Sequence, residues 1–186
     1  MRFGKIRKIL DKALQNDSIQ LYLQPIIDSS SRKIIAAEAL SRLYDEELGV
    51  ISPVEFIELA EKNGNIEALC EQILHKTCDF IKTNDIQSLG IKWINVNLSP
   101  IQCQNSDLAD RISSIAEKYS VPSNKIHLEV TEESMVDANI LSRQMKNLIS
   151  YGYDISLDDY GSGFSNIIRV KRFPFNNIKL DMQIVW

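Results

Sequence analysis

Short runs in which aliphatic and polar residues alternate are the feature that most constrains the fold of this chain. Segments with helical periodicity separate these runs, and strands that alternate with helices predict a parallel sheet covered by helices, an α/β fold. The predicted strands are Gln20–Ile26, Ile34–Leu40, Ile91–Leu98, Ile126–Thr131, Ile155–Asp159 and Ile178–Asp181. The predicted helices between them are Pro53–Glu61, Glu67–Lys82, Leu108–Tyr119, Ile140–Tyr151 and Ile167–Arg172.

Polar side chains occur toward the carboxyl ends of the predicted strands. Leu128 and Val130 alternate with Glu129 and Thr131, for example, so the two sets point to opposite faces of the strand. In an antiparallel sheet the polar face would simply meet water. Here helices follow the strands, which favours a β/α barrel whose aliphatic face packs on the helices and whose polar strand ends meet at one mouth.

The residues expected at this mouth are hard oxygen ligands without an accompanying histidine or thiol. They are Glu38, Asn97, Glu129, Asp158 and Asp159. Such a set favours Mg²⁺ or Mn²⁺ over zinc or iron. Because carboxylates placed together repel one another, a divalent ion, and preferably a pair, is the natural partner. A metal pair activates water and stabilises an in-line phosphoryl displacement, with Lys179 as a nearby cation or proton acceptor and Arg42 as a phosphate ligand.

Composition excludes several other classes of protein. The 21 Lys and Arg against 25 Asp and Glu give a net charge of −4, which disfavours nucleic acid as the main partner. No uncharged apolar run reaches about 18 residues, so we expect no membrane segment. Three cysteines without a C-x-x-C pair indicate reduced thiols and a cytoplasmic protein. Gly161-Ser162-Gly163 is a poor dinucleotide-binding fingerprint because Asn166 takes the third glycine position.

The ordered motifs of the chain resemble those of EAL domains, the bacterial phosphodiesterases of the second messenger cyclic di-GMP. The signature Glu38-Ala39-Leu40 is followed by Arg42. The other matching motifs, in family order, are Leu21–Ile26, Ser52–Glu61, Asn95–Ser99, Glu129–Glu132, Asp158–Gly163 and Lys179–Asp181. The resemblance extends from about Ile9 to Asp181.

This resemblance implies a role for each matching residue. One Mg²⁺ or Mn²⁺ ion would be held by Glu38, Asn97, Glu129 and Asp158, and a second by Asp158 and Asp159. Lys179 would lie by the attacking water with Asp181 beside it, so the implied catalytic residues are Lys179, Glu38 and Asp181. Glu132 would steady the Asp158-Asp159 loop, and the dinucleotide would contact Gln24, Leu40 and Arg42. The implied reaction opens one phosphodiester link of cyclic di-GMP and yields linear pGpG.

The resemblance also implies an arrangement of the chain. EAL domains form eight-stranded β/α (TIM-like) barrels with an antiparallel first strand, and such barrels typically need about 250 residues. We expect residues 1–16 to form a lead-in helix, similar to a linker from an upstream sensory or cyclase domain. Residues 17–186 would form an EAL domain with about six strands, lacking the last two βα units.

Two consequences of a six-strand arrangement are left open by the sequence. Unpaired strand edges favour a homo-oligomer. In similar domains the last two βα units carry a metal-site glutamate and a guanine-contacting glutamine. Because this chain would lack both residues, the resemblance also allows an alternative function. In that alternative the chain is an inactive EAL domain that binds cyclic di-GMP or a protein partner, or an inactive fragment.

Overall fold

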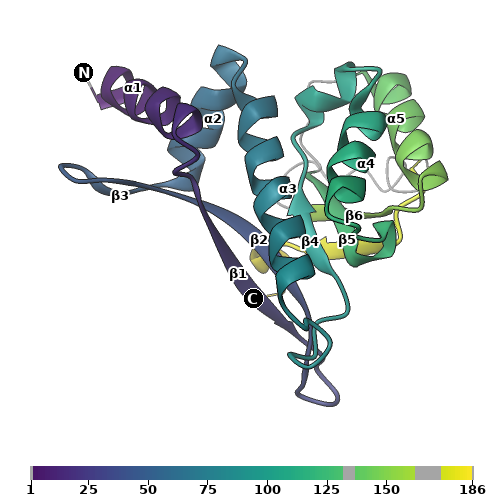
Figure 1. Ribbon diagram of the computed structural model, residues 1–186. Helices are drawn as coiled ribbons and strands as arrows, with labels where there is room; N and C mark the ends of the chain where they lie inside the picture. The colour runs from purple at the N-terminus through teal and green to yellow at the C-terminus, as the bar shows by residue number, and fades with distance from the viewer. Residues whose placement is uncertain (1, 132–136, 162–172, 186) are drawn as a thin grey trace.

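The computed structural model describes residues 2–131, 137–161 and 173–185 (Figure 1). Its strands are β1 (Gln20–Ile27), β2 (Ile34–Asp45), β3 (Gly49–Ile51), β4 (Ile94–Asn97), β5 (Ile126–Thr131), β6 (Asp154–Tyr160) and β7 (Asn177–Leu180). Its α-helices are α1 (Arg2–Gln15), α2 (Pro53–Asn63), α3 (Ile66–Thr83), α4 (Leu108–Lys118), α5 (Ala138–Ser150) and α7 (Met182–Val185). Two short 3₁₀ helices are η1 (Pro100–Gln104) and η2 (Ser123–Lys125). The helix predicted at 167–172 lies outside the described residues.

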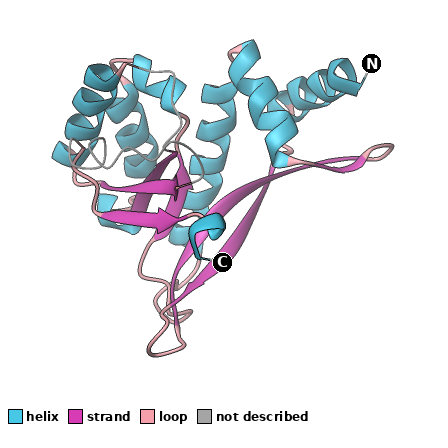
Figure 2. Cartoon of the chain, turned by 180° about the vertical axis from the view of Figure 1, so that it is seen from behind, coloured by secondary structure: helices cyan, strands magenta, loops and turns pink. Residues whose placement is uncertain are grey.

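All six predicted strands form one sheet of mainly parallel strands. The order is β1-β2-β4-β5-β6-β7, with β3 paired to β2. The first pair, β1 and β2, is antiparallel, and each later neighbour along the path is parallel. Figure 2 shows this sheet from behind. Over the residues that the structure describes the sheet stays open, with β1 and β7 at its two ends.

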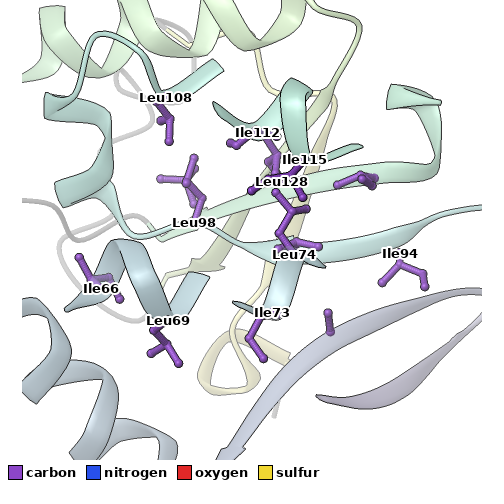
Figure 3. Close-up of a cluster of buried hydrophobic side chains, with 14 of the residues drawn as sticks. Ile66, Leu69, Ile73, Leu74, Ile94, Leu98, Leu108, Ile112, Ile115 and Leu128 are labelled. Carbon is purple, nitrogen blue, oxygen red and sulfur yellow. The ribbon is translucent and has the colours of Figure 1, made fainter. Parts of the chain in front are cut away.

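Helices cover the aliphatic face of the central strands. Helix α3 packs on β1, β2 and β4, and α5 packs on β6. The predicted aliphatic positions Ile94, Leu128 and Ile155 are at most 1% exposed. Figure 3 shows Ile94 and Leu128 among side chains of α3 and α4, including Leu74 and Ile112. This apolar layer holds the strands while their opposite face remains free for polar residues.

The N-terminal helix α1 shares the same core. Ile6 and Leu10 are fully buried, and α1 packs against α2 and α3. The Asn65 side-chain amide at the start of α3 donates to Asp11 Oδ1 at 2.7 Å. Helix α1 is therefore docked on the core that α2 and α3 share. Within the described chain, no helix combines the length and the apolar character that crossing a bilayer requires.

Two features of the sheet were not predicted. Strand β2 continues to Asp45, whose Oδ1 accepts hydrogen bonds from the backbone N–H groups of Glu47 and Leu48, and the chain then returns as β3 through Gly49 at φ 69°. The aliphatic face of β7 differs from that of the central strands, because Ile178 and Leu180 are 43% and 57% exposed.

Candidate metal-binding site

Three carboxylates from three strands converge on the polar face of the sheet. Glu38 lies on β2, Glu129 on β5 and Asp158 on β6, and one oxygen of each lies within 4.8 Å of the others. Oxygens that ligate one Mg²⁺ at about 2.1 Å lie at most about 4.2 Å apart, so a small inward movement would complete a shared site. The donor set and its spacing fit a small divalent cation.

The ammonium group of Lys179 on β7 contacts all three carboxylates. Its Nζ lies 2.9 Å from Glu38 Oε2, 2.9 Å from Glu129 Oε2 and 3.1 Å from Asp158 Oδ1. Burial lowers the pKa of Lys179, but the surrounding carboxylates, led by Glu129, outweigh burial and raise this pKa above its ordinary value. Lys179 therefore stays protonated and offsets part of the negative charge of the cluster.

Glu129 is the most buried member of the cluster. Its side chain is fully inaccessible to solvent. The pKa of Glu129 is raised to about 7. Burial is the main cause, the charges of Glu38 and Asp158 add to the rise, and the Lys179 ammonium partly opposes it. A carboxylate in these surroundings gains more from a cation than an exposed one does.

Asn97 and Asp159, also predicted as metal ligands, lie next to the cluster. The Asn97 side-chain amide donates to Glu38 Oε1 at 3.0 Å. Asp159 is exposed and has a left-handed φ of 53°, and its backbone N–H donates to Asp158 Oδ1 at 3.0 Å. Partial desolvation of its carboxyl group, together with the charges of Asp158 and Asp181, raises the pKa of Asp159. The structure thus brings Asn97 into contact with Glu38 and places Asp159 beside the three carboxylates.

The remaining predicted residues are spread around this centre. Asp181 follows β7, and its Oδ1 accepts the backbone N–H of Gln183 at 2.7 Å. Gln24 is exposed on β1 and is paired in register with Glu38. Glu132 lies outside the described residues.

A cavity of about 260 Å³ adjoins the cluster and is lined by residues that include Leu40, Arg42 and Asn97. Its apolar wall comes from α2 and α3, with Ile57 and Leu69 among the lining residues. Apolar walls with a few polar groups are typical of small-molecule sites. Two of the three predicted dinucleotide contacts, Leu40 and Arg42, therefore line one cavity beside the acidic cluster.

Some polar contacts at the site were missed by the sequence analysis. Asn95 donates from Nδ2 to Glu129 Oε1 at 2.6 Å, and Ser99 donates from Oγ to Glu61 Oε1 at 2.7 Å. The alternation in β4 puts Asn95 on the same face as Asn97, which was the available signal for the first contact. The second joins α2 to the end of β4, and nothing in the residue spacing indicates it.

Comparison with known proteins identifies the family. Residues 7–185 match the family model of the EAL domain. The chain is 32% identical over 92% of its length to the bifunctional diguanylate cyclase/cyclic di-GMP phosphodiesterase MucR of Pseudomonas aeruginosa, covering 25% of that protein. It is also 32% identical over 96% of its length to the probable cyclic di-GMP phosphodiesterase PdeI of Escherichia coli, covering 23% of it. The chain thus spans about a quarter of the length of these curated relatives.

Solved structures show the same fold. The MucR phosphodiesterase in complex with cyclic di-GMP superposes with a TM-score of 0.88 at 30% identity, over 97% of this chain and 74% of that one. The FimX EAL domain of Pseudomonas aeruginosa, bound to cyclic di-GMP, matches with a TM-score of 0.79 at 19% identity, over 97% of this chain and 72% of that one. The expected TIM-like architecture is confirmed, and the chain belongs to the EAL domain family.

Proposed function

We propose that this chain hydrolyses cyclic di-GMP to linear pGpG with the help of Mg²⁺ or Mn²⁺. The observation that carries the proposal is the convergence of Glu38, Glu129 and Asp158 around Lys179 beside a cavity lined by Arg42. The relatives MucR and PdeI, named for cyclic di-GMP phosphodiesterase activity, support the same substrate.

The residues present fit a divalent metal centre. Glu38, Asn97, Glu129 and Asp158 would hold one ion, and Asp158 with Asp159 would hold a second. Metal ions at this position would supply Lewis acidity to the phosphate and a water molecule of lowered pKa.

The protein side chains have separate tasks in the reaction. Arg42 would orient a phosphate through its planar guanidinium group, and the cavity wall at Leu40 would bind the base. Lys179, with Asp181 beside it, would stabilise negative charge at the attacked phosphate and guide the water. Water attacks phosphorus, the bond from phosphorus to the 3′ oxygen breaks, and that oxygen takes up a proton, which yields pGpG. Glu132 would steady the end of β6, which carries Asp158 and Asp159.

Chromatography of the chain incubated with cyclic di-GMP and Mn²⁺ tests the proposal. We expect pGpG to form and to disappear when a chelator is added. Glu38→Ala should lower the rate at least about 100-fold, because it removes a metal-binding carboxylate. Glu58→Ala, which removes an exposed glutamate paired with Lys62 on α2, is the matched control and should keep full activity. Activity that survives Glu38→Ala contradicts the metal assignment.

Binding without hydrolysis is the second candidate. The cavity is lined by Leu40 and Arg42, whereas Glu129 and Lys179 are outside its lining, which favours ligand binding that does not require them. Calorimetric binding of cyclic di-GMP without formation of pGpG in the presence of Mn²⁺ would assign the chain to this regulatory class.

A further inference from the structure

A chain of hydrogen bonds leads from the interior of the sheet to the acidic cluster. The indole Nε1–H of Trp93 donates to Asn95 Oδ1 at 2.8 Å, and Asn95 Nδ2 donates to Glu129 Oε1 at 2.6 Å. Asn95 is 5% exposed and Glu129 is 1% exposed. The bond from Asn95 to Glu129 is buried, so water competes little with it, and the bond from Trp93 is part-buried.

Trp93 fixes the orientation of the Asn95 amide. An indole N–H can only donate, so the Asn95 oxygen must face Trp93 and the NH₂ group must face Glu129. Trp93 is itself held by its stacking on His127, with ring centroids 4.6 Å apart and planes inclined by 12°. His127 Nε2 lies 3.1 Å from Asp154 Oδ2. The donor that reaches Glu129 is therefore set by packed groups on neighbouring strands.

The two oxygens of Glu129 consequently have different surroundings. Oε1 accepts the Asn95 amide, whereas Oε2 faces Lys179 at 2.9 Å, where Glu38 and Asp158 also point. We propose that Asn95, oriented by Trp93, is a positioning residue that engages Oε1 of Glu129 and presents Oε2 alone to the metal. This inference rests on the proposed metal-dependent function.

A glutamate that offers one oxygen to the metal, and not both, affects which ion the site prefers. Ca²⁺ takes six to eight oxygen ligands at about 2.3–2.6 Å and often binds carboxylates through both oxygens, whereas Mg²⁺ requires near-octahedral geometry at about 2.0–2.1 Å. A glutamate with one oxygen engaged suits the smaller, octahedral ion. Asn95 therefore contributes to selectivity for the ion as well as to affinity.

Calorimetric titration of the full chain with Mn²⁺ and with Ca²⁺ tests this role. Asn95→Ala should weaken Mn²⁺ binding by about 10- to 100-fold, the usual effect of removing an outer partner of a metal ligand. It should weaken Ca²⁺ binding less, so the ratio of the two affinities should fall. Trp93→Phe keeps an aromatic ring on His127 but removes the indole donor, and it should shift the ratio in the same direction by a smaller factor.

Asn65→Ala is the matched control, because it removes another asparagine-to-carboxylate hydrogen bond, the one to Asp11 on α1. It should leave both metal affinities unchanged. An unchanged ratio in folded Asn95→Ala and Trp93→Phe, or an equal loss of Mn²⁺ affinity in Asn65→Ala, would overturn the inference. Wild-type chain that binds Mn²⁺ without producing pGpG refutes the hydrolase proposal alone, since the affinity comparison still holds. Wild-type chain that binds no Mn²⁺ refutes both.

Discussion

At the scale of single residues, Lys179 is the ammonium group that meets the acidic cluster. Its ammonium lies within 3.1 Å of carboxylates from β2, β5 and β6. Their charge keeps its pKa raised despite burial. An ammonium group at this position suits the stabilisation of negative charge at a phosphate.

Lys179→Ala should therefore slow the chemical step more than it weakens binding of cyclic di-GMP. We expect kcat to fall by about 100-fold or more, because a positioned charge typically contributes that much. KM should change much less. Steady-state kinetics with Mn²⁺ separates the two parameters, and a rise in KM with kcat unchanged would show that Lys179 only binds substrate.

The cluster residues differ in how well the sequence predicts them. Glu38, Glu129 and Asp158 were predictable because the period-two pattern fixes which strand residues share a face. The link from Trp93 through Asn95 was not, because it depends on rotamers and on packing between β4 and β5.

At the scale of elements, Gly90 marks the tight turn that precedes β4. Gly90 precedes β4 with φ +80°, and a Cβ atom there would lie 2.7 Å from the carbonyl oxygen of Ile34. This oxygen belongs to the first residue of β2, the strand that carries Glu38. The turn thus brings β4 close to β2.

Gly90→Ala should lower the free energy of unfolding by about 2 kcal/mol, because it combines a left-handed backbone with a backbone clash. Gly4→Ala is the control, because it should raise the free energy of unfolding. Gly4 is in α1, a Cβ atom there would meet nothing within 4 Å, and alanine is favoured in helices. Urea unfolding of both variants gives the comparison, and equal stabilities would contradict the argument.

The six strands and the four described helices predicted between them followed from periodicity, while β3 could not be predicted. Its three residues, Gly49–Ile51, are too few to show a period, and the turn before it depends on hydrogen bonds to the Asp45 side chain. The parallel pairing of β4, β5 and β6 was predictable because helices connect these strands.

At the scale of the whole molecule, the two ends of the described sheet differ. Pro25 lies within β1 and removes one backbone donor from that edge, which disfavours pairing there. At the other end the aliphatic side chains of β7 and α7 are exposed, with Leu180 at 57%, Met182 at 74% and Ile184 at 50%. Whether a sheet closes depends on long-range contacts that residue periodicity does not encode.

We expect the 186-residue chain to self-associate through the β7 side, because this association would remove apolar surface from water. Sedimentation velocity over a range of concentrations should show a monomer–dimer equilibrium. The double variant Met182→Glu with Ile184→Glu should shift it to monomer, whereas Val50→Glu, at a comparably exposed residue of β3, should not. A wild-type monomer at every concentration would contradict this expectation.

The contact of Lys179 with three carboxylates affects whether the chain needs metal in order to fold. Because the chain provides its own counter-charge at the acidic cluster, folding does not have to wait for metal, in contrast to small domains that are unfolded without zinc. A chelator should therefore abolish turnover while leaving the cooperative thermal transition in place, as circular dichroism would report. On the proposed function, folding and metal loading would then be separate events, so folded chain would be present before the ion binds.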